Sequence, residues 1–368
     1  MIKNKIIVIP IEGDFAHSAD FLRQTALTLA KHNQVYIYDQ INSYFFLKKK
    51  PNIKYPSVKN LYFHQAKYLL PGRRFVWLEK LNRKLSWWVF LAKFGSRDKI
   101  LWFFYPNYHD LAQIKIKNSL KIYDCVDYQE DVEKEKKLIA QIDCFFVNSE
   151  VLAKLHQKQS KQAILLSAQG FFEPSKKLIK KSQLSFDKPV IGFVGGINYR
   201  LDFSLLDNLI KNNPQWQFVL YGPIQKDQKK DPQFKTEVWL KKISQYKNVL
   251  MGSSNNRHEL YGLIKQFDVA IVPYNTDILF NKYCYPMKIF EYLYFGKTIL
   301  STEIEELKNQ KFKGLIFTSN QLSDWQKKLQ KLLKTKQQQT GLIKKQKELA
   351  KANSWQKKLQ LISKFISL

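Results

Sequence analysis

The hydrophobic positions of the first half of the chain fall into short runs that alternate with longer amphipathic stretches. The runs are rich in β-branched and aromatic residues, which is typical of strands. They lie at Lys5–Ile11, Gln34–Tyr38, Asn60–His64, Ile100–Tyr105, Lys121–Cys125, Cys144–Asn148 and Ala163–Leu166. The stretches between them predict helices, for example Ser18–Lys31 and Val132–Ile142. Because the runs lack strict alternation, they predict parallel strands that helices cover on both faces.

The same pattern resumes after a polar, basic stretch at Phe171–Ser185, which we interpret as a linker. A second series opens with an apolar run at Val190 and predicts further strands at Gln217–Tyr221, Val249–Met251, Val269–Val272, Thr298–Ser301 and Gly314–Phe317. The 368 residues therefore predict two α/β domains, at residues 1–180 and 181–350. Leu, Ile and Trp recur at helical spacing near the end, and we expect residues 351–368 to form a helix that packs back on the first domain.

The chain carries a formal charge of +30, from 61 Lys and Arg against 31 Asp and Glu. The excess divides evenly between the two halves, so it is not a basic tail on a neutral domain. Such a charge attracts nucleic acid, an anionic membrane surface or a phosphorylated substrate, although a compositional bias of the source gives the same excess. No RNA-recognition, zinc-finger or helix-turn-helix motif accompanies it, so nucleic acid is the least favoured partner.

The chain has three cysteines, Cys125, Cys144 and Cys284. They are too few for a disulfide framework and lack the spacing of a zinc site, and their scatter fits a reducing compartment. No apolar run reaches the roughly 18 residues of a membrane span, and the first apolar run is too short for a signal peptide. We therefore expect a cytoplasmic protein.

A glycine pair, Gly195 and Gly196, follows the first strand of the second series and precedes a predicted helix that begins near Asp202. Paired glycines let the backbone approach a ligand and can turn amide N–H groups toward an anion. Arg200 is close enough in sequence to add a cation to a phosphate site. A tight turn without a ligand uses the same residues, and the chain has neither a G-x-G-x-x-G fingerprint nor a P-loop.

A helix predicted from Pro286 to about Phe295 is the second candidate site. Proline suits the first turn of a helix, and Gly296 is placed to end it. Lys288 lies in the first turn, where a cation is unfavourable for the helix dipole unless an anion binds nearby. Glu291 lies one turn on and can accept hydrogen bonds from sugar hydroxyls. An ordinary surface helix is the alternative, but the spacing P-x-K-x-x-E favours a ligand site.

The stretch PMKIFEYLYFGKTILST resembles the nucleotide-sugar donor motif of two-domain GT-B glycosyltransferases, close to glycosyltransferase family 4. GFVGGINYRLD, WQFVLYGP and NVLMGSSNNRHELYGLIKQFDVAIVPY resemble earlier pieces of that donor domain, and AKANSWQKKL resembles its closing helix. KILWFFYPN and KIYDCVDYQED resemble bacterial surface-polysaccharide transferases. The resemblance covers most of the chain. It implies an α/β protein with two Rossmann-like domains that face each other across a cleft.

The resemblance also implies the donor site. The diphosphate would be bound by Gly195, Gly196, Arg200, Lys288 and the amides around Pro286 and Met287, and the ribose by Glu291. The base would stack near Tyr221, Gly222, Pro223 and Gly252. No metal or other cofactor is implied, because cations and helix amides take over the role of a metal. The family carries two glutamates eight positions apart. Glu291 matches the second glutamate, whereas Tyr283 stands at the position of the first. The contact to the donor sugar and the retaining stereochemistry, which the resemblance implies, therefore lack the first glutamate.

Three polar residues follow predicted strands of the first domain and are candidates for acceptor chemistry, namely Asp14, His109 and Asp127. The carboxyl ends of parallel strands face the ligand crevice, so His or Asp there can position or deprotonate an acceptor hydroxyl. Caps and turns use the same residues. Asp127 is preferred because it recurs in the surface-polysaccharide transferases that the chain resembles.

A helix predicted within residues 73–93 places Trp77, Leu81 and Trp88 on one stripe and basic residues opposite. Arg73 and Arg74 stand at its start. This composition is typical of a helix on an anionic membrane surface and suits a lipid-linked acceptor. A helix packed on the first domain's sheet is the alternative.

The sequence thus predicts a glycosyltransferase that moves a sugar from a nucleoside-diphosphate sugar to a cell-surface glycan or lipid-linked acceptor, at the inner face of the membrane. Two alternatives stay open. One is a sugar-nucleotide epimerase or phosphorylase of the same fold, which would not need a second glycan. The other is a non-catalytic, membrane-associated scaffold.

Overall fold

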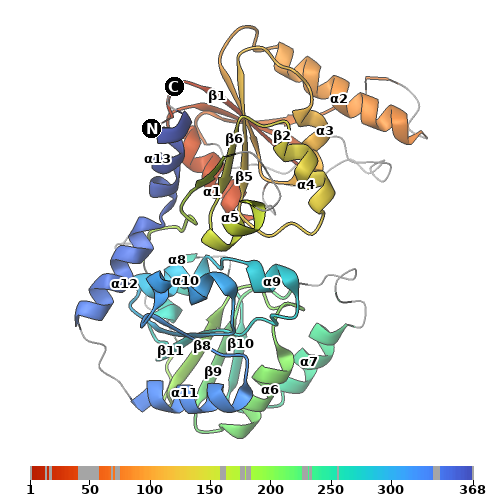
Figure 1. The fold of residues 1–368 in the computed structure, drawn as a ribbon. Helices are drawn as coiled ribbons and strands as arrows, with labels where there is room; N and C mark the ends of the chain where they lie inside the picture. The colour runs from red at the N-terminus through yellow and green to blue at the C-terminus, as the bar shows by residue number, and fades with distance from the viewer. Residues whose placement is uncertain are drawn as a thin grey trace. The chain divides into compact units, whose positions relative to one another are not determined.

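The computed structural model describes most of the chain, namely residues 2–12, 15, 19–39, 58–67, 69–70, 75–157, 163–174, 179, 184–225, 231, 234–254, 257–334 and 340–366. The chain forms two compact units (Figure 1). Unit 1 comprises Met1–Gly170 together with Trp355–Leu368, and unit 2 comprises Phe171–Ser354. Among the described residues, no helix is both long enough and apolar enough to span a membrane.

Unit 1 is built on a seven-stranded parallel sheet with the order β3-β2-β1-β4-β5-β6-β7. Its strands are β1 (Ile6–Ile11), β2 (Gln34–Asp39), β3 (Leu61–Gln65), β4 (Lys99–Phe103), β5 (Ser119–Cys125), β6 (Cys144–Val147) and β7 (Ile164–Leu166). Each corresponds to a predicted strand. The order changes direction between β1 and β4, which opens a crevice at their carboxyl ends where ligands of α/β proteins bind.

Helices cover both faces of this sheet. On one face, α1 (Asp20–Ala30) and α13 (Trp355–Ile366) pack in one cluster with Ile7 and Ile9 of β1. The cluster of the other face holds Val8 and residues from α2 (Val76–Ala92), α3 (His109–Ala112), α4 (Val132–Ile139) and α5 (Glu150–Gln157). Successive residues of β1 thus point into two apolar clusters, which explains its unbroken apolar run.

The last helix, α13, is fixed to unit 1 by a buried ion pair and a tryptophan. Lys358 Nζ of α13 lies 2.8 Å from Asp124 Oδ1 of β5, and both side chains are fully buried. Trp355, the first residue of α13, packs on Gly170 so closely that a Cβ there would lie 2.5 Å from its ring. Gly170 also has φ +87°, a conformation that favours glycine.

Unit 2 is built on a six-stranded parallel sheet with the order β10-β9-β8-β11-β12-β13. The strands are β8 (Val190–Val194), β9 (Gln217–Tyr221), β10 (Val249–Gly252), β11 (Val269–Val272), β12 (Thr298–Ser301) and β13 (Ile316–Thr318). All of these strands were expected from the apolar runs. The order repeats that of unit 1, so the crevice lies beyond the ends of β8 and β11.

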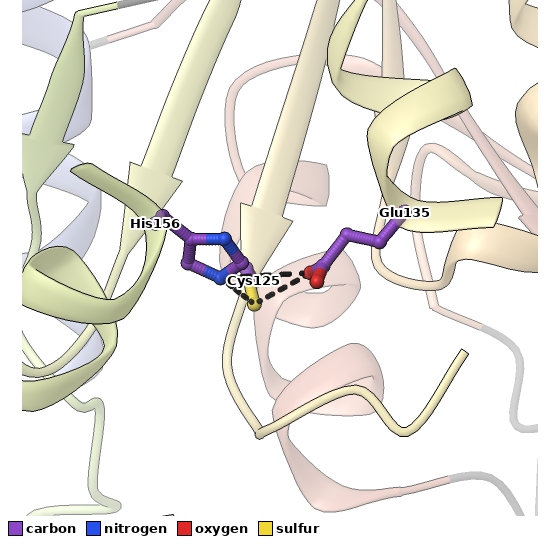
Figure 2. Close-up of side chains that lie close together, drawn as sticks. All are labelled: Cys125, Glu135 and His156. Carbon is purple, nitrogen blue, oxygen red and sulfur yellow. Dashed lines mark hydrogen bonds and ion pairs between the residues drawn. The ribbon is translucent and has the colours of Figure 1, made fainter. Parts of the chain in front are cut away.

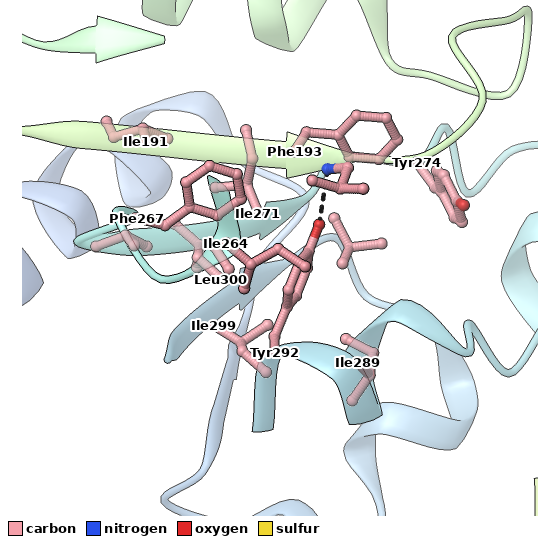
Figure 3. Close-up of a cluster of buried hydrophobic side chains, with 14 of the residues drawn as sticks. Ile191, Phe193, Ile264, Phe267, Ile271, Tyr274, Ile289, Tyr292, Ile299 and Leu300 are labelled. Atoms are coloured by element: carbon pink, nitrogen blue, oxygen red, sulfur yellow. Dashed lines mark hydrogen bonds between the residues drawn. The ribbon is translucent and has the colours of Figure 1, made fainter. Parts of the chain in front are cut away.

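The helices of unit 2 are α6 (Phe203–Asn212), α7 (Lys235–Ile243), α8 (Arg257–Ile264), α9 (Leu279–Tyr283), α10 (Lys288–Tyr294), α11 (Leu322–Lys334) and α12 (Thr340–Ala352). Figure 3 shows how α10 is joined to the sheet: Ile289 and Tyr292 enter the apolar core, and the Tyr292 hydroxyl accepts a hydrogen bond from Val194 N at 2.9 Å. This contact fixes α10 at the carboxyl end of β8.

Several elements differ from the sequence prediction. The helix expected over residues 351–368 is α13, which begins only at Trp355 because α12 ends at Ala352 and the Asn353 side chain bonds to Leu349 O. The helix expected from Pro286 begins at Lys288, and the short helix α9 precedes it. The sequence places the domain boundary at residue 180, whereas unit 1 ends at Gly170 because Phe171 is buried in the core of unit 2.

Candidate functional site

Three loops meet at the carboxyl ends of β8, β9 and β10 in unit 2. Backbone hydrogen bonds join them, from Gly195 N to Tyr221 O at 3.0 Å and from Gly222 N to Gly252 O at 2.8 Å. Gly222 has φ +156°, and a Cβ there would lie 2.1 Å from the carbonyl oxygen of Gly195. Only glycine at 222 allows the loops after β8 and β9 to come this close.

Lys288 reaches the Gly195 loop from the first turn of α10. Gly195 has φ +150°, and a Cβ there would lie 2.6 Å from Lys288 Nζ. The same Nζ donates to the Tyr274 hydroxyl at 2.5 Å and lies 4.2 Å from the centroid of the Phe193 ring. The side chain is thus held between the residues that follow β8 and β11, where the strand order changes direction. A cation beside backbone amides at this point is a suitable arrangement for a phosphate.

Arg200 is held by groups of the same loops. Its Nε donates to Asn281 Oδ1 at 2.7 Å, and its guanidinium lies over the rings of Tyr274 and Phe280, with centroid distances of 4.7 and 4.5 Å. Asn281 in turn donates to the carbonyl oxygens of Arg200 and Asn275. Arg200 therefore joins α9 to the loop after β8, in addition to any role toward a ligand.

Glu291 lies four residues into α10, and 9% of it is exposed. Its carboxylate Oε1 lies 3.8 Å from Arg257 Nη1 of α8, a long ion pair. The other predicted donor residues border the same loops. A Cβ at Gly196 would lie 2.5 Å from Gln225 Oε1, and a Cβ at Gly252 would lie 2.4 Å from the Tyr221 ring. Pro286 has no N–H, so only Met287 and Lys288 can offer amides at the start of α10.

A groove of about 840 Å³ lies at the corresponding crevice of unit 1. Glu12 after β1, Asn107 and His109 after β4, and residues of α2, α3 and α4 line it. Five of the lining residues are basic and two are acidic; the basic residues are Lys80, Arg83, Lys84, Lys134 and Lys137. Arg83 also forms an ion pair with Asp110 at 2.6 Å, which joins α2 to α3. The surplus of cations favours an anionic ligand in this groove.

One backbone contact sets the tautomer of His109. Its Nδ1 lies 3.1 Å from the carbonyl oxygen of Pro106. Because a carbonyl only accepts, this contact places a proton on Nδ1, and in the neutral imidazole Nε2 is then a hydrogen-bond acceptor. Asp127 is half-buried and does not line the groove, although it was the preferred candidate from the sequence. Asp14, Arg73 and Arg74 lie outside the described residues.

The helix α2 leaves an apolar face exposed. Trp77 and Trp88 are 63% and 51% exposed, and Val76, Leu81 and Val89 accompany them. The opposite face is buried through Trp87, Phe90 and Leu91, so the helix packs on the sheet and still presents an apolar surface. Trp77 and Leu81 also line the groove, which makes the groove and the exposed face continuous.

Residues 174–349 match the family model "Glycosyl transferases group 1". This match covers almost all of unit 2, including Lys288 and Glu291. Unit 2 is thus similar to group 1 glycosyltransferases. A protein of Bacillus subtilis (strain 168) named "Putative teichuronic acid biosynthesis glycosyltransferase TuaH" is 23% identical over 229 residues, 55% of this chain and 55% of that protein. The chain thus spans about half the length of this curated relative.

Solved structures with a similar fold cover nearly the whole chain. Sucrose-phosphate synthase from Thermosynechococcus elongatus has a TM-score of 0.73 at 15% identity and covers 99% of each chain. Anabaena Alr3699/HepE, solved in complex with UDP and glucose, has a TM-score of 0.69 at 12% identity and covers 98% of this chain and 99% of its own. Both units therefore have the fold of GT-B glycosyltransferases, as the sequence predicts.

Sequence reasoning missed several residues that the fold brings to the candidate sites. Tyr274 and Arg257 contact Lys288 and Glu291, yet they lie 14 and 34 positions before them in the sequence. The position of Tyr274 directly after strand β11 is a signal that points to the crevice. The basic residues of α4 gave no such signal, because Lys134 and Lys137 look like ordinary surface lysines until α4 lies beside α2.

Proposed function

We propose that this glycosyltransferase moves a sugar from a nucleoside-diphosphate sugar to an anionic acceptor, either a cell-surface glycan or a lipid-linked glycan, with retention at the donor carbon. The observation that carries the proposal is the position of Lys288 Nζ, against Gly195 and Tyr274 at the crevice of unit 2. Departure of the nucleoside diphosphate builds negative charge on its phosphates. A cation fixed beside backbone amides therefore stabilises the transition state, in which this charge develops, more than it stabilises the bound donor.

The proposed donor chemistry needs no metal ion. Lys288 and the amides of Met287 and Lys288 neutralise the diphosphate, and Glu291 accepts hydrogen bonds from the ribose hydroxyls while Arg257 orients it. In unit 1 the groove takes the acceptor. Lys134 and Lys137 bind the anionic groups, and His109 Nε2 faces the reacting hydroxyl as hydrogen-bond acceptor or base.

An acceptor-dependence assay tests the proposal. The purified full chain is incubated with a panel of nucleoside-diphosphate sugars, with and without lipid-linked glycans extracted from membranes, and release of nucleoside diphosphate is measured. We expect release that requires both substrates. Conversion of one nucleotide sugar into another without an acceptor would indicate an epimerase, and donor binding without turnover in any combination would indicate a scaffold.

We further propose that α2 places the enzyme on an anionic membrane at the cytoplasmic face. Its exposed tryptophans insert into the interface, while Lys80 and Lys84 contact lipid phosphates. Because the groove continues into this apolar face, a lipid-linked acceptor reaches His109 without leaving the membrane.

A variant with both Trp77→Ser and Trp88→Ser should bind anionic vesicles roughly a hundredfold more weakly, since each side chain contributes about 1.5 kcal/mol on burial. Co-sedimentation with vesicles that contain phosphatidylglycerol measures this, and binding should also fall as salt is raised. Val238→Ser on α7, at a side chain that is 67% exposed, serves as the control. Equal vesicle binding by the double variant and the unaltered protein would contradict the proposal.

A further inference from the structure

Unit 1 contains a buried cluster of three side chains that the donor and acceptor sites do not use. Cys125 is the last residue of β5, Glu135 lies on α4 and His156 lies on α5. Figure 2 shows the three side chains pointing toward one point between these elements. All three are buried, with Glu135 only 3% and His156 only 5% exposed.

Two sulfur hydrogen bonds and one long ion pair join the three side chains. Cys125 Sγ lies 3.6 Å from Glu135 Oε1 and 3.8 Å from His156 Nε2, and Nε2 lies 3.6 Å from Oε1. An N–H···O hydrogen bond needs about 2.7–3.2 Å. Within the described part of the chain, His156 Nδ1 has no hydrogen-bond partner. Among the described residues, the buried imidazole therefore has only a weak sulfur contact at Nε2 and no partner at Nδ1, and a buried nitrogen without a partner is rare in native proteins.

The same distances fit the ligand atoms of a tetrahedral metal ion. Zinc bonds are about 2.3 Å to thiolate sulfur and about 2.0–2.2 Å to nitrogen and oxygen, so the ligand atoms of a tetrahedral site lie roughly 3.3–3.6 Å apart. The three observed separations of 3.6, 3.6 and 3.8 Å exceed these values only slightly. Sulfur, imidazole and carboxylate together form a donor set that suits zinc.

The surroundings supply the outer contacts that such a site needs. The Tyr123 hydroxyl donates to Glu135 Oε1 at 2.6 Å, and this bond orients the carboxylate. The backbone carbonyl oxygen of Asp127 lies 3.3 Å from Cys125 Sγ and is a candidate for the fourth ligand.

We propose that Cys125, Glu135 and His156 bind a zinc ion that joins β5, α4 and α5. The thiol of Cys125 loses its proton on binding, and the thiolate, the carboxylate and His156 Nε2 each donate an electron pair to the metal. The site is structural: it lies inside unit 1 and fixes the loop that carries Asp127. The sequence hides it because the ligands come from three separate elements rather than from a C-x-x-C pair.

Metal analysis of the full chain tests the site, with protein purified without a polyhistidine tag from zinc-supplemented cells. Inductively coupled plasma mass spectrometry should find about one zinc per chain. The variants Cys125→Ser and His156→Gln should lose it. Cys284→Ser, which alters an equally buried cysteine of unit 2, should keep it. Metal retained by both cluster variants would overturn the proposal.

Cobalt substitution provides a second readout that does not depend on the folding of any variant. After zinc is removed with a chelator, the unaltered protein is refilled with Co²⁺, and its absorption spectrum is recorded. A thiolate-to-cobalt charge-transfer band and intense tetrahedral d–d bands are expected. Unaltered protein that holds no zinc and gives no charge-transfer band would show that the cluster is a metal-free part of the core.

Discussion

Lys288→Ala should lower kcat/KM for the nucleotide-sugar donor by roughly 10²–10³-fold, the loss that follows removal of one charge-stabilising donor from a transition state. Lys288 Nζ is held by the Tyr274 hydroxyl and lies over the Phe193 ring, so its position is set before the donor binds. Preorganisation of this kind is what makes a cation effective during departure of a diphosphate. Steady-state kinetics with varied donor at saturating acceptor measure the loss.

Two further variants separate charge from position. Lys282 lies on the neighbouring helix α9, and its Nζ lies over the Tyr283 ring. Lys282→Ala removes this cation and should leave kcat/KM nearly unchanged. Gly195→Ala keeps Lys288 but places a Cβ 2.6 Å from its Nζ, at a φ of +150° that favours glycine. It should impair the donor step almost as strongly as loss of the lysine. Full activity in Lys288→Ala would remove Lys288 from the donor site.

Lys358→Met should lower the free energy of unfolding of unit 1 by about 3–5 kcal/mol, because it leaves a buried carboxylate without its cation. Lys358 and Asp124 are both fully buried and lie 2.8 Å apart, and Asp124 Oδ2 has no other partner within the described part of the chain. The pair joins α13 to β5 across 234 positions of sequence. Denaturant titration followed by circular dichroism measures the loss.

A double variant shows whether the loss comes from the uncompensated charge. Asp124→Leu combined with Lys358→Met removes both charges and should recover most of the stability, since buried ion pairs contribute little beyond an apolar pair of similar size. Lys242→Met, which breaks the exposed pair with Asp207 at 2.6 Å, should have little effect on stability. A loss in Lys358→Met no larger than that in Lys242→Met would contradict the structural role of the pair.

The sheets could be predicted from the sequence because their signal is local. An apolar run of four or five residues buried on both faces marks its own position, and β9, β11 and β12 begin and end at the predicted residues. The order of the strands within each sheet could not be predicted in this way, because parallel pairing depends on the crossover connections rather than on any one apolar run. The helix boundaries moved by a few residues where Asn353 or Pro286 acts on the backbone.

The candidate sites were predictable only where a residue and its partners lie within one motif. Lys288, Glu291 and the Gly195 loop stand in such motifs. The partners that hold them, Tyr274 and Arg257, come from other strands and helices. The groove of unit 1 and the cluster around Cys125 share this property, because each gathers side chains from several separate elements. The spacing of residues along the chain does not predict contacts between separate elements.

The most direct test of the donor site is a calorimetric titration that compares the nucleoside diphosphate, nucleoside monophosphate and nucleoside of one base. If Lys288 and the Gly195 loop bind the diphosphate, the unaltered protein should bind the diphosphate at least about tenfold more tightly than the monophosphate. In Lys288→Ala that preference should disappear. Equal affinity for all three ligands, or an undiminished preference in the variant, would contradict the account.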